Sequence, residues 1–319
     1  MAFSTGKKLF RTLISTILSL SIIITSALFT GCSEDEANQW LNEIFGMLNY
    51  EISGDTIDGE AKLKMHVIDV GQGDSVLVQC GEKNVLIDCG ENGMGGTVLD
   101  YLRRAGVSHL DWIIGTHPHS DHIGGMDTVI KSNDITIDHV MMPQTSKNMT
   151  PTTMTYTEVL AAIKKKKLKI TRPVPGEEYD LDGVTMLVLS PDKGAKYEEL
   201  NDYSIVLKFT FGNVSIITGG DASNLVERQI ITRDYDLSAD IYKVSHHGGK
   251  DGNSQAFLDE INPRYAAISV GADNRYGHPK KEILKRLRNI DCEVYRTDLD
   301  GNIIFESDGK NISVIVSKG

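Results

Sequence analysis

The sequence predicts an α/β protein in which two mixed β-sheets lie between outer helices. In the first half, β-branched runs at residues 63–70, 75–79 and 84–88 precede a helical pattern at 97–105 and a strand pattern at 111–116. The second half repeats this order of strands and helices, which suits one domain built from two similar layers. In each half a cluster of histidines follows a strand directly, where α/β architectures gather their ligands.

The second half contains the larger number of expected elements. A hairpin pattern surrounds Gly212-Asn213, and three helical patterns alternate with strand patterns after it. We therefore expect a single domain at residues 61–319. The expected strands are 204–211, 214–218, 240–245, 265–270, 293–296, 303–306 and 312–316, and the expected helices are 225–233, 255–261 and 280–289.

Composition indicates a packed and acidic domain. The chain has 319 residues, of which 40% are hydrophobic and 24% charged, and its formal net charge is −11. Binding of duplex DNA without regard to sequence depends on neutralising phosphates with Lys and Arg. The charge therefore argues against a broad duplex-binding surface and leaves room for a small substrate or a local basic strip.

Residues 1–31 predict a targeting segment. Basic residues precede an uncharged apolar run, which closes with Gly31-Cys32 and is followed by acidic residues. A small residue directly before a cysteine at this point resembles a bacterial lipobox, which implies a signal peptide, lipidation of Cys32 and an extracytoplasmic protein anchored in the membrane by lipid. The alternative is an uncleaved membrane anchor. Residues 32–60 are acidic and polar, and we expect them to tether the domain to the membrane.

The residues with the clearest chemistry lie at 116–125, which read THPHSDHIGG. His117 and His119 project to the same side of an extended segment, so both imidazoles can meet one cation. Once the chain turns, Asp121 and His122 can face a second cation. Mixed imidazole and carboxylate ligands suit Zn²⁺, Mn²⁺ or Fe, and burial of four such groups without a metal is costly. We therefore expect a site for two divalent metal ions, Zn²⁺ or Mn²⁺.

These residues match the HxHxDH signature of the metallo-β-lactamase superfamily, which the sequence resembles from residue 63 to 319. The resemblance implies an αββα sandwich. It also implies that Asp88 supports the ligand loop, that Asp221 bridges both metals, and that one member of the pair His246-His247 is the last ligand. Because neighbouring side chains on a strand point in opposite directions, we expect His247 to be the ligand and His246 to lie beside the substrate.

Three further segments are similar to the soluble hydrolase domain of the ComEC-type competence DNA-uptake proteins. They read VIDVGQGDS at 67–75, NDYSIVL at 201–207 and NRYGHP at 274–279. This resemblance implies metal-dependent hydrolysis of phosphodiesters, above all DNA, whereas translocation by a membrane channel is not expected. The third-motif histidine of the superfamily has no counterpart here, since residues 201–204 stand in its place. The cation at His117 and His119 is therefore expected to be one ligand short.

The expected mechanism uses two cations bridged by Asp221 to lower the pKa of a shared water, which then attacks phosphorus. His246 or His278 would give a proton to the leaving oxygen, because imidazole titrates in a useful range. Arg275 would bind phosphate, whereas a turn capped by aspartate explains Asp74 nearly as well as contact with the substrate. The expected catalytic residues are Asp121, His246 and His278, and the expected substrate contacts are Arg275, Asp74 and Ser204.

The favoured hypothesis is an extracytoplasmic phosphodiesterase or nuclease, and no protein partner is inferred. A cell-wall phosphodiesterase acting on phosphorylcholine or teichoic acid fits an acidic, anchored protein equally well. A third hypothesis is a non-catalytic surface receptor for DNA, against which the intact set of ligands argues. A β-lactamase is disfavoured because such an enzyme usually needs the missing histidine.

Overall fold

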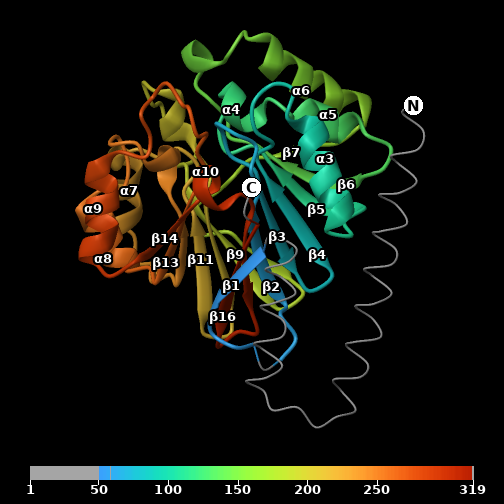
Figure 1. Ribbon diagram of the computed structural model, residues 1–319. Helices are drawn as coiled ribbons and strands as arrows, with labels where there is room; N and C mark the ends of the chain where they lie inside the picture. Colours follow the sequence, from blue (N-terminus) through green and yellow to red (C-terminus); the bar gives the residue numbers. More distant parts are fainter. Residues whose placement is uncertain (1–49, 58, 318–319) are drawn as a thin grey trace, which may run out of the picture. The chain divides into compact units, whose positions relative to one another are not determined.

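The computed structural model describes residues 50–57 and 59–317, and its first sheet has nine strands (Figure 1). The strands at residues 63–67, 76–80 and 83–87 pair in succession in antiparallel fashion. The pairings that follow, from residues 83–87 through 109–114 to 170–171, are parallel. In their order across the sheet the strands are β1 (Tyr50–Gly54), β16 (Ile312–Ser317), β15 (Ile303–Ser307), β2 (Leu63–Val67), β3 (Val76–Cys80), β4 (Lys83–Ile87), β5 (His109–Ile114), β6 (Thr136–Met141) and β7 (Ile170–Thr171).

The second sheet has seven strands and is mixed in the same way. Its antiparallel part is a meander, and its parallel part carries the second histidine cluster. In their order across the sheet the strands are β14 (Glu293–Arg296), β13 (Tyr265–Ile268), β12 (Ile241–Lys243), β11 (Val214–Thr218), β10 (Val206–Phe211), β9 (Val184–Ser190) and β8 (Glu178–Leu181).

The two sheets pack face to face over one apolar core. Alternate residues of β2, such as Met65 and Val67, meet alternate residues of β10, such as Leu207 and Phe209, and all four are buried. This follows from the period of two residues in a strand, which sends every second side chain to the same face. The sandwich thus buries its strongest β-branched and aromatic runs between the sheets.

Two groups of helices cover the outer faces of the sandwich (Figure 1). Those of the first group pack on the first sheet over a second apolar core, and those of the second group pack on the second sheet over a third. The first group is α3 (Gly95–Arg104), α5 (Met126–Lys131) and α6 (Met154–Lys165), and the second is α7 (Asn224–Ile231), α8 (Gln255–Ile261) and α9 (Lys281–Asn289).

Helix starts follow local capping chemistry. The hydroxyls of Thr153, Ser223 and Ser254 accept hydrogen bonds from backbone N–H groups in the first turns of α6, α7 and α8. Five shorter helical segments complete the fold: α4 (Ser120–Ile123), α10 (Thr297–Asp300), and the 3₁₀ turns η1 (Lys147–Met149), η2 (Leu200–Tyr203) and η3 (Ser245–Gly248). The four layers confirm the predicted αββα sandwich.

The first sheet begins earlier than the expected domain start at residue 61. Strand β1 lies inside the segment 32–60 that was expected to be a tether, so its described end belongs to the sheet instead. The Asp55 N–H donates to the carbonyl of Ile312 at 2.7 Å, and the Asp55 carboxylate accepts two hydrogen bonds from Arg264 at 2.6 and 2.8 Å. Polar composition does not reveal such pairing, because edge strands are often polar.

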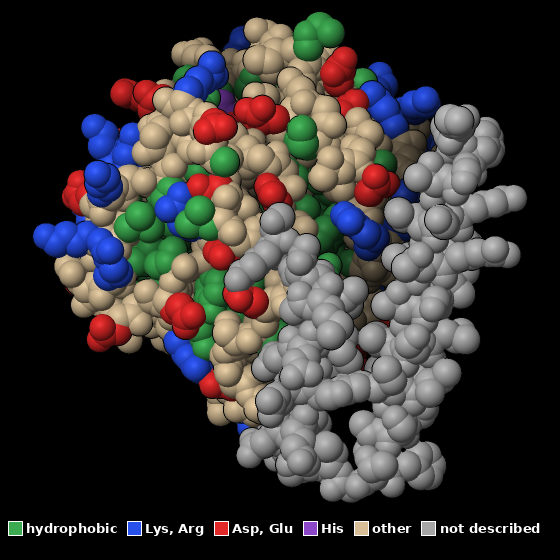
Figure 2. All heavy atoms as spheres, in the orientation of Figure 1, with side chains coloured by type: hydrophobic (Ala, Val, Ile, Leu, Met, Phe, Trp, Pro, Cys, Tyr) green, Lys and Arg blue, Asp and Glu red, His purple; other side chains and the backbone are tan. Residues whose placement is uncertain are grey.

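The expected targeting segment, Cys32 and most of the expected tether lie outside the described residues. Within the described part of the chain, no helix has the length and apolar character that crossing a membrane requires. Figure 2 shows Lys and Arg side chains gathered toward two edges of one face, near α9 and near α5 and α6, with acidic side chains scattered between them. Basic side chains on this face therefore form local groups, for which the negative net charge of the chain leaves room.

Candidate metal centre

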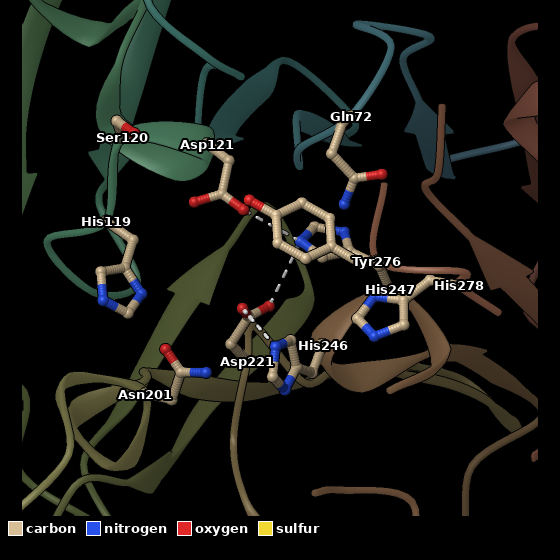
Figure 3. A pocket seen from close by; sticks show the side chains of 10 residues that line it. All are labelled: Gln72, His119, Ser120, Asp121, Asn201, Asp221, His246, His247, Tyr276 and His278. Carbon is tan, nitrogen blue, oxygen red and sulfur yellow. Dashed lines mark ion pairs between the residues drawn. The ribbon is translucent and has the colours of Figure 1, made fainter. Parts of the chain in front are cut away.

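The candidate centre lies where strands of both sheets end at a common edge. Its residues follow β4, β5, β11 and β12, which run in parallel pairs. They surround a cavity of about 290 Å³ (Figure 3). Six of the sequence-predicted residues line this cavity: His119, Asp121, Asp221, His246, His247 and His278.

Asp88 contacts both ends of the loop at residues 116–122, which carries four of the candidate ligands. Its carboxylate accepts hydrogen bonds from the N–H of Thr116 at 2.8 Å and from the hydroxyl of Thr116 at 2.6 Å. It also lies 2.7 Å from Nδ1 of His122, which turns Nε2 of that ring toward Asp221. Asp88 has a φ of 59°, a conformation that aspartate tolerates better than most residues. This arrangement agrees with the supporting role expected for Asp88.

One oxygen of Asp221 faces a tight group of ligand-type atoms. His122 Nε2 lies 3.2 Å from Asp221 Oδ1, and His247 Nε2 lies 3.7 Å from the same oxygen. Asp121 Oδ2 lies 3.4 Å from His247 Nε2. One ligand atom from each of these four residues lies within 4.8 Å of the others. The structure therefore brings together residues that the sequence separates by about a hundred positions.

The other oxygen of Asp221 faces a second group. His117 Nε2 lies 3.8 Å from Asp221 Oδ2, and His246 Nε2 lies at the same distance from it. His119 joins this group because its Nδ1 lies 3.0 Å from His117 Nε2. Figure 3 shows His119 and His246 on different sides of Asp221, with Asn201 between them.

The chemistry of these atoms fits divalent cations. Asp221 Oδ1, His122 Nε2 and His247 Nε2 are buried, and none has a hydrogen-bond partner of good geometry. Buried polar atoms without partners are rare in folded proteins because each one costs free energy. Here the unpaired atoms converge on one point, and their mixture of imidazole and carboxylate suits Zn²⁺, Mn²⁺ or Fe.

The pKa values of these groups show how strongly they interact. Burial disfavours the charged ring of His122, but Asp221 and Asp88 outweigh burial and raise the pKa of His122 well above its usual range. Burial also opposes charge on Asp221, yet His122 and His247 hold its pKa well below the usual value. The carboxylates therefore keep positive charge beside them, a position that a divalent cation can take when it displaces the imidazole protons.

Asp74 and Ser204 differ from the expected substrate contacts. Asp74 is buried and pairs with Lys243, whose Nζ lies 2.8 Å from Asp74 Oδ2, while its Oδ1 lies 3.3 Å from Nδ1 of His247. Ser204 is also buried, and its hydroxyl accepts a hydrogen bond from the N–H of Asp221 at 3.0 Å. Since neither lines the cavity, both support ligand residues rather than meet the substrate.

The argument from strand geometry for the histidine pair is wrong. Strand β12 ends at Lys243, and His246 and His247 lie in the turn η3 with left-handed backbone angles, φ 50° and ψ 43° and φ 51° and ψ 26°. The turn directs both imidazoles toward Asp221 instead of to opposite sides. His247 still stands in the tight group, and His246 still lines the cavity.

The rim carries the residues of the 274–279 segment. Arg275 is exposed and does not line the cavity, but its guanidinium lies over the ring of Tyr276, 5.2 Å from the centroid. Tyr276 is 46% exposed and stacks on His278 with centroids 5.8 Å apart. Burial, followed by the neighbouring His246 and His247, lowers the pKa of His278 to about 4.

Sequence reasoning missed several residues of the site. Gln72, Ser120, Asn201 and Tyr276 line the cavity, and Lys243 makes the buried pair with Asp74. Each of the four lies inside or beside a segment that the sequence analysis singled out. Their position in those segments was the available signal, but their residue types have no metal-binding chemistry strong enough to be noticed alone.

Comparison with known proteins agrees with this geometry. The family described as the metallo-beta-lactamase superfamily matches residues 68–272, which include the loop motif, Asp221 and the histidine pair. The chain belongs to the metallo-β-lactamase superfamily. The solved structure of CmlA, a diiron β-hydroxylase from Streptomyces venezuelae, has a TM-score of 0.50 and 12% identity over 78% of this chain and 55% of that one, which shows the fold alone.

Within the superfamily, the relatives of this chain include competence proteins. ComE operon protein 3 of Bacillus subtilis is 30% identical over 263 residues, which cover 75% of this chain and 32% of that protein. Competence protein ComA of Neisseria gonorrhoeae is 28% identical and covers 77% and 32%. This chain thus spans about a third of the length of each of these relatives. The resemblance to ComEC-type proteins is confirmed, and the chain has the fold of a metal-dependent hydrolase.

Proposed function

We propose that this protein is a metal-dependent phosphodiesterase that cleaves nucleic acid outside the cytoplasmic membrane. The observation that carries the proposal is the position of Asp221, whose two oxygens face separate groups of imidazoles. Paired cations roughly 3.5–4 Å apart are a common device for displacement at phosphorus. The competence proteins among the relatives support nucleic acid as the substrate.

In this proposal Asp121, His122 and His247 would hold one cation and His117 and His119 the other, with one oxygen of Asp221 available to each group. Bound cations would lower the pKa of a water molecule and neutralise charge on phosphoryl oxygens. Asp88 keeps the ring of His122 oriented, which protects ligand geometry.

The rim residues act on the substrate directly. Arg275 is exposed beside the cavity and can bind a phosphate through two N–H groups. His278 lines the cavity, and its pKa of about 4 leaves the ring neutral near pH 7, so its imidazole can relay a proton from water to the leaving oxygen rather than donate as an imidazolium.

We also propose that residues 1–31 direct export and that Cys32 is lipidated, with the chain up to β1 as the link to the membrane. Growth with a labelled fatty acid tests this: the wild-type chain should carry the label and a Cys32→Ser variant should not. A labelled Cys32→Ser chain would contradict lipidation at this residue.

The function is tested with the full chain, purified in detergent and supplied with Mn²⁺ or Zn²⁺. Hydrolysis of single-stranded DNA, double-stranded DNA and bis-p-nitrophenyl phosphate should depend on metal and fall in His119→Ala by more than the roughly 10–100-fold that loss of a residue supporting a metal ligand costs. The matched control is His109→Ala, which removes an exposed imidazole outside the centre.

The cell-wall phosphodiesterase and receptor hypotheses predict different results in these hydrolysis assays. Cleavage of the small diester without cleavage of either DNA would favour the cell-wall phosphodiesterase, which the acidic net charge also suits. Binding of DNA without hydrolysis of any substrate, under either metal, would favour the receptor and contradict the proposal.

A further inference from the structure

The centre lacks the histidine that the superfamily supplies from its third motif. Residues 201–204 stand in that place, and none carries an imidazole. Tyr203 donates to the carbonyl of Tyr197, and Asp202 accepts from the hydroxyl of Ser223. Of these four residues Asn201 alone lines the cavity, and its amide side chain lies beside His119, with a buried oxygen that has no hydrogen-bond partner of good geometry. The side of Asp221 that faces His117 and His119 therefore has one imidazole fewer than the superfamily pattern implies, and its remaining position is open to water or to another side chain.

His246 is placed to fill this position. The two oxygens of Asp221 have matched surroundings: Oδ1 has His247 Nε2 at 3.7 Å, and Oδ2 has His246 Nε2 at 3.8 Å. His117 Nε2 is also 3.8 Å from Oδ2, so His246 and His117 approach the same oxygen. Figure 3 shows His246 directed at Asp221 from the side of the cavity where Asn201 lies.

The backbone conformation of η3 gives the ring of His246 this orientation toward Asp221. Two consecutive residues without glycine adopt left-handed angles in η3, which L-amino acids disfavour. The His246 N–H donates to the carbonyl of Gly220, and the Gly249 N–H donates to the carbonyl of His246, at 2.9 and 2.6 Å. A Cβ at Gly249 would lie 3.2 Å from Cγ of His246, so glycine leaves room for the ring. Strain of this kind usually persists where function requires it.

No hydrogen bond among the described residues explains the orientation of the ring. Nδ1 of His246 is buried and has no hydrogen-bond partner, and Nε2 faces the carboxylate of Asp221. The neighbouring ring of His278 meets it edge-on, with centroids 5.5 Å apart and an interplanar angle of 81°. An imidazole held by a strained turn and directed at a carboxylate oxygen is suited to a cation on that oxygen.

We infer that His246 is the third imidazole ligand of the cation at Asp221 Oδ2, in place of the absent third-motif histidine. The adjacent residues His246 and His247 then serve different cations, one on each oxygen of Asp221. This assignment replaces the proton-donor role expected for His246 and leaves His278 as the proton-transfer residue of the proposed function. It rests on cation binding at the centre, and it does not depend on which bond the enzyme cleaves.

The test counts metal ions. The full chain in detergent is loaded with Zn²⁺, passed through a desalting column and measured by mass spectrometry for zinc per chain. Wild type should hold two ions and His246→Ala one, with affinity for the second ion reduced by more than the roughly 10–100-fold that loss of a supporting residue costs. His278→Ala, which removes the neighbouring imidazole of the same cavity, should hold two. Asn201→Ala should also hold two.

A second variant separates loss of a ligand from misfolding. His246→Cys provides a thiolate, which is a strong zinc ligand, and should restore the second ion. His246→Ala with two ions at wild-type affinity would overturn the inference, as would a wild-type chain that holds a single ion. Failure of the proposed function looks different: a wild-type chain with two ions, one of them lost in His246→Ala, that hydrolyses no phosphodiester.

Discussion

Lys243 and Asp74 form a buried ion pair behind the metal centre, with Nζ and Oδ2 2.8 Å apart and side chains only 1% and 4% exposed. The second oxygen of Asp74 lies 3.3 Å from Nδ1 of His247. The same nitrogen lies 3.0 Å from the carbonyl oxygen of Ser269. Burial opposes charge on Asp74, but Lys243 and His247 outweigh it and lower the pKa of Asp74. The ion pair therefore helps to fix the orientation of His247, a proposed metal ligand.

Removal of one partner of this pair should destabilise the protein strongly. Lys243→Met leaves the carboxylate of Asp74 buried without its cation, which costs about 3–5 kcal/mol in the free energy of unfolding. Urea unfolding in the presence of a chelator measures this without a contribution from metal. Arg103→Ala is the control, because its pair with Asp100 is exposed and worth about 0–1 kcal/mol. Equal losses in both variants would contradict a structural role for the buried pair.

Asp88→Ala should weaken metal binding although Asp88 is not a proposed ligand. The change leaves the N–H of Thr116 without an acceptor and frees the ring of His122 to rotate. Loss of such a supporting carboxylate typically costs about 10–100-fold in metal affinity. Competition with a chromophoric chelator measures the affinity, and Asp100→Ala, an exposed carboxylate on α3, should not change it.

Tyr276→Ala should impair the cleavage of oligonucleotides more than that of small diesters. The exposed ring at the rim can stack on a base, and such contacts are worth about 1–3 kcal/mol per base, or roughly 5–150-fold in affinity. We expect KM for single-stranded DNA to rise within this range, with KM for a strand of abasic sugar-phosphate unchanged. Tyr276→Phe keeps the stacking face and should behave like wild type. An equal rise of KM for both strands would argue against base stacking.

Acid should destabilise the protein partly through His66. This ring is buried between Tyr101 and Gln79, and burial lowers its pKa from 6.5 to about 4. Between these values the unfolded chain binds the proton more tightly, so stability is full above pH 6.5 and declines as the pH falls toward 4. The expected loss is about 3 kcal/mol, since each pKa unit corresponds to about 1.4 kcal/mol.

His66→Gln isolates this contribution. The amide can still bond to Tyr101 but does not titrate, so the variant should lose about 3 kcal/mol less than wild type between pH 7.5 and 4. Urea unfolding at several pH values measures the difference. Parallel curves for the two proteins would show that His66 has the same pKa in both states.

Much of the fold was predictable because local patterns agree with it. Runs of β-branched residues located β2, β3 and β4, a hairpin pattern around Gly212-Asn213 located β10 and β11, and glycine after a helical pattern located the end of α3. Sequence analysis gave no bounds for any element between residues 126 and 200, where α6, β8 and β9 lie, and expected there only a helix that ends near residues 164–167. Strand β1 was also missed, because its pairing with β16 depends on residues far along the chain rather than on its own composition.

The sequence by itself determined the set of candidate ligands and, outside β1 and residues 126–200, the order of strands and helices. Their residue types and their positions after strands carry that information, since imidazoles and carboxylates at strand ends have few other uses. Tertiary structure alone decided which oxygen of Asp221 each histidine faces, and that Asp74 pairs with Lys243, 169 positions away. The physical reason is that a left-handed turn at two histidines and a long-range ion pair are fixed by packing, which no local pattern of side chains records.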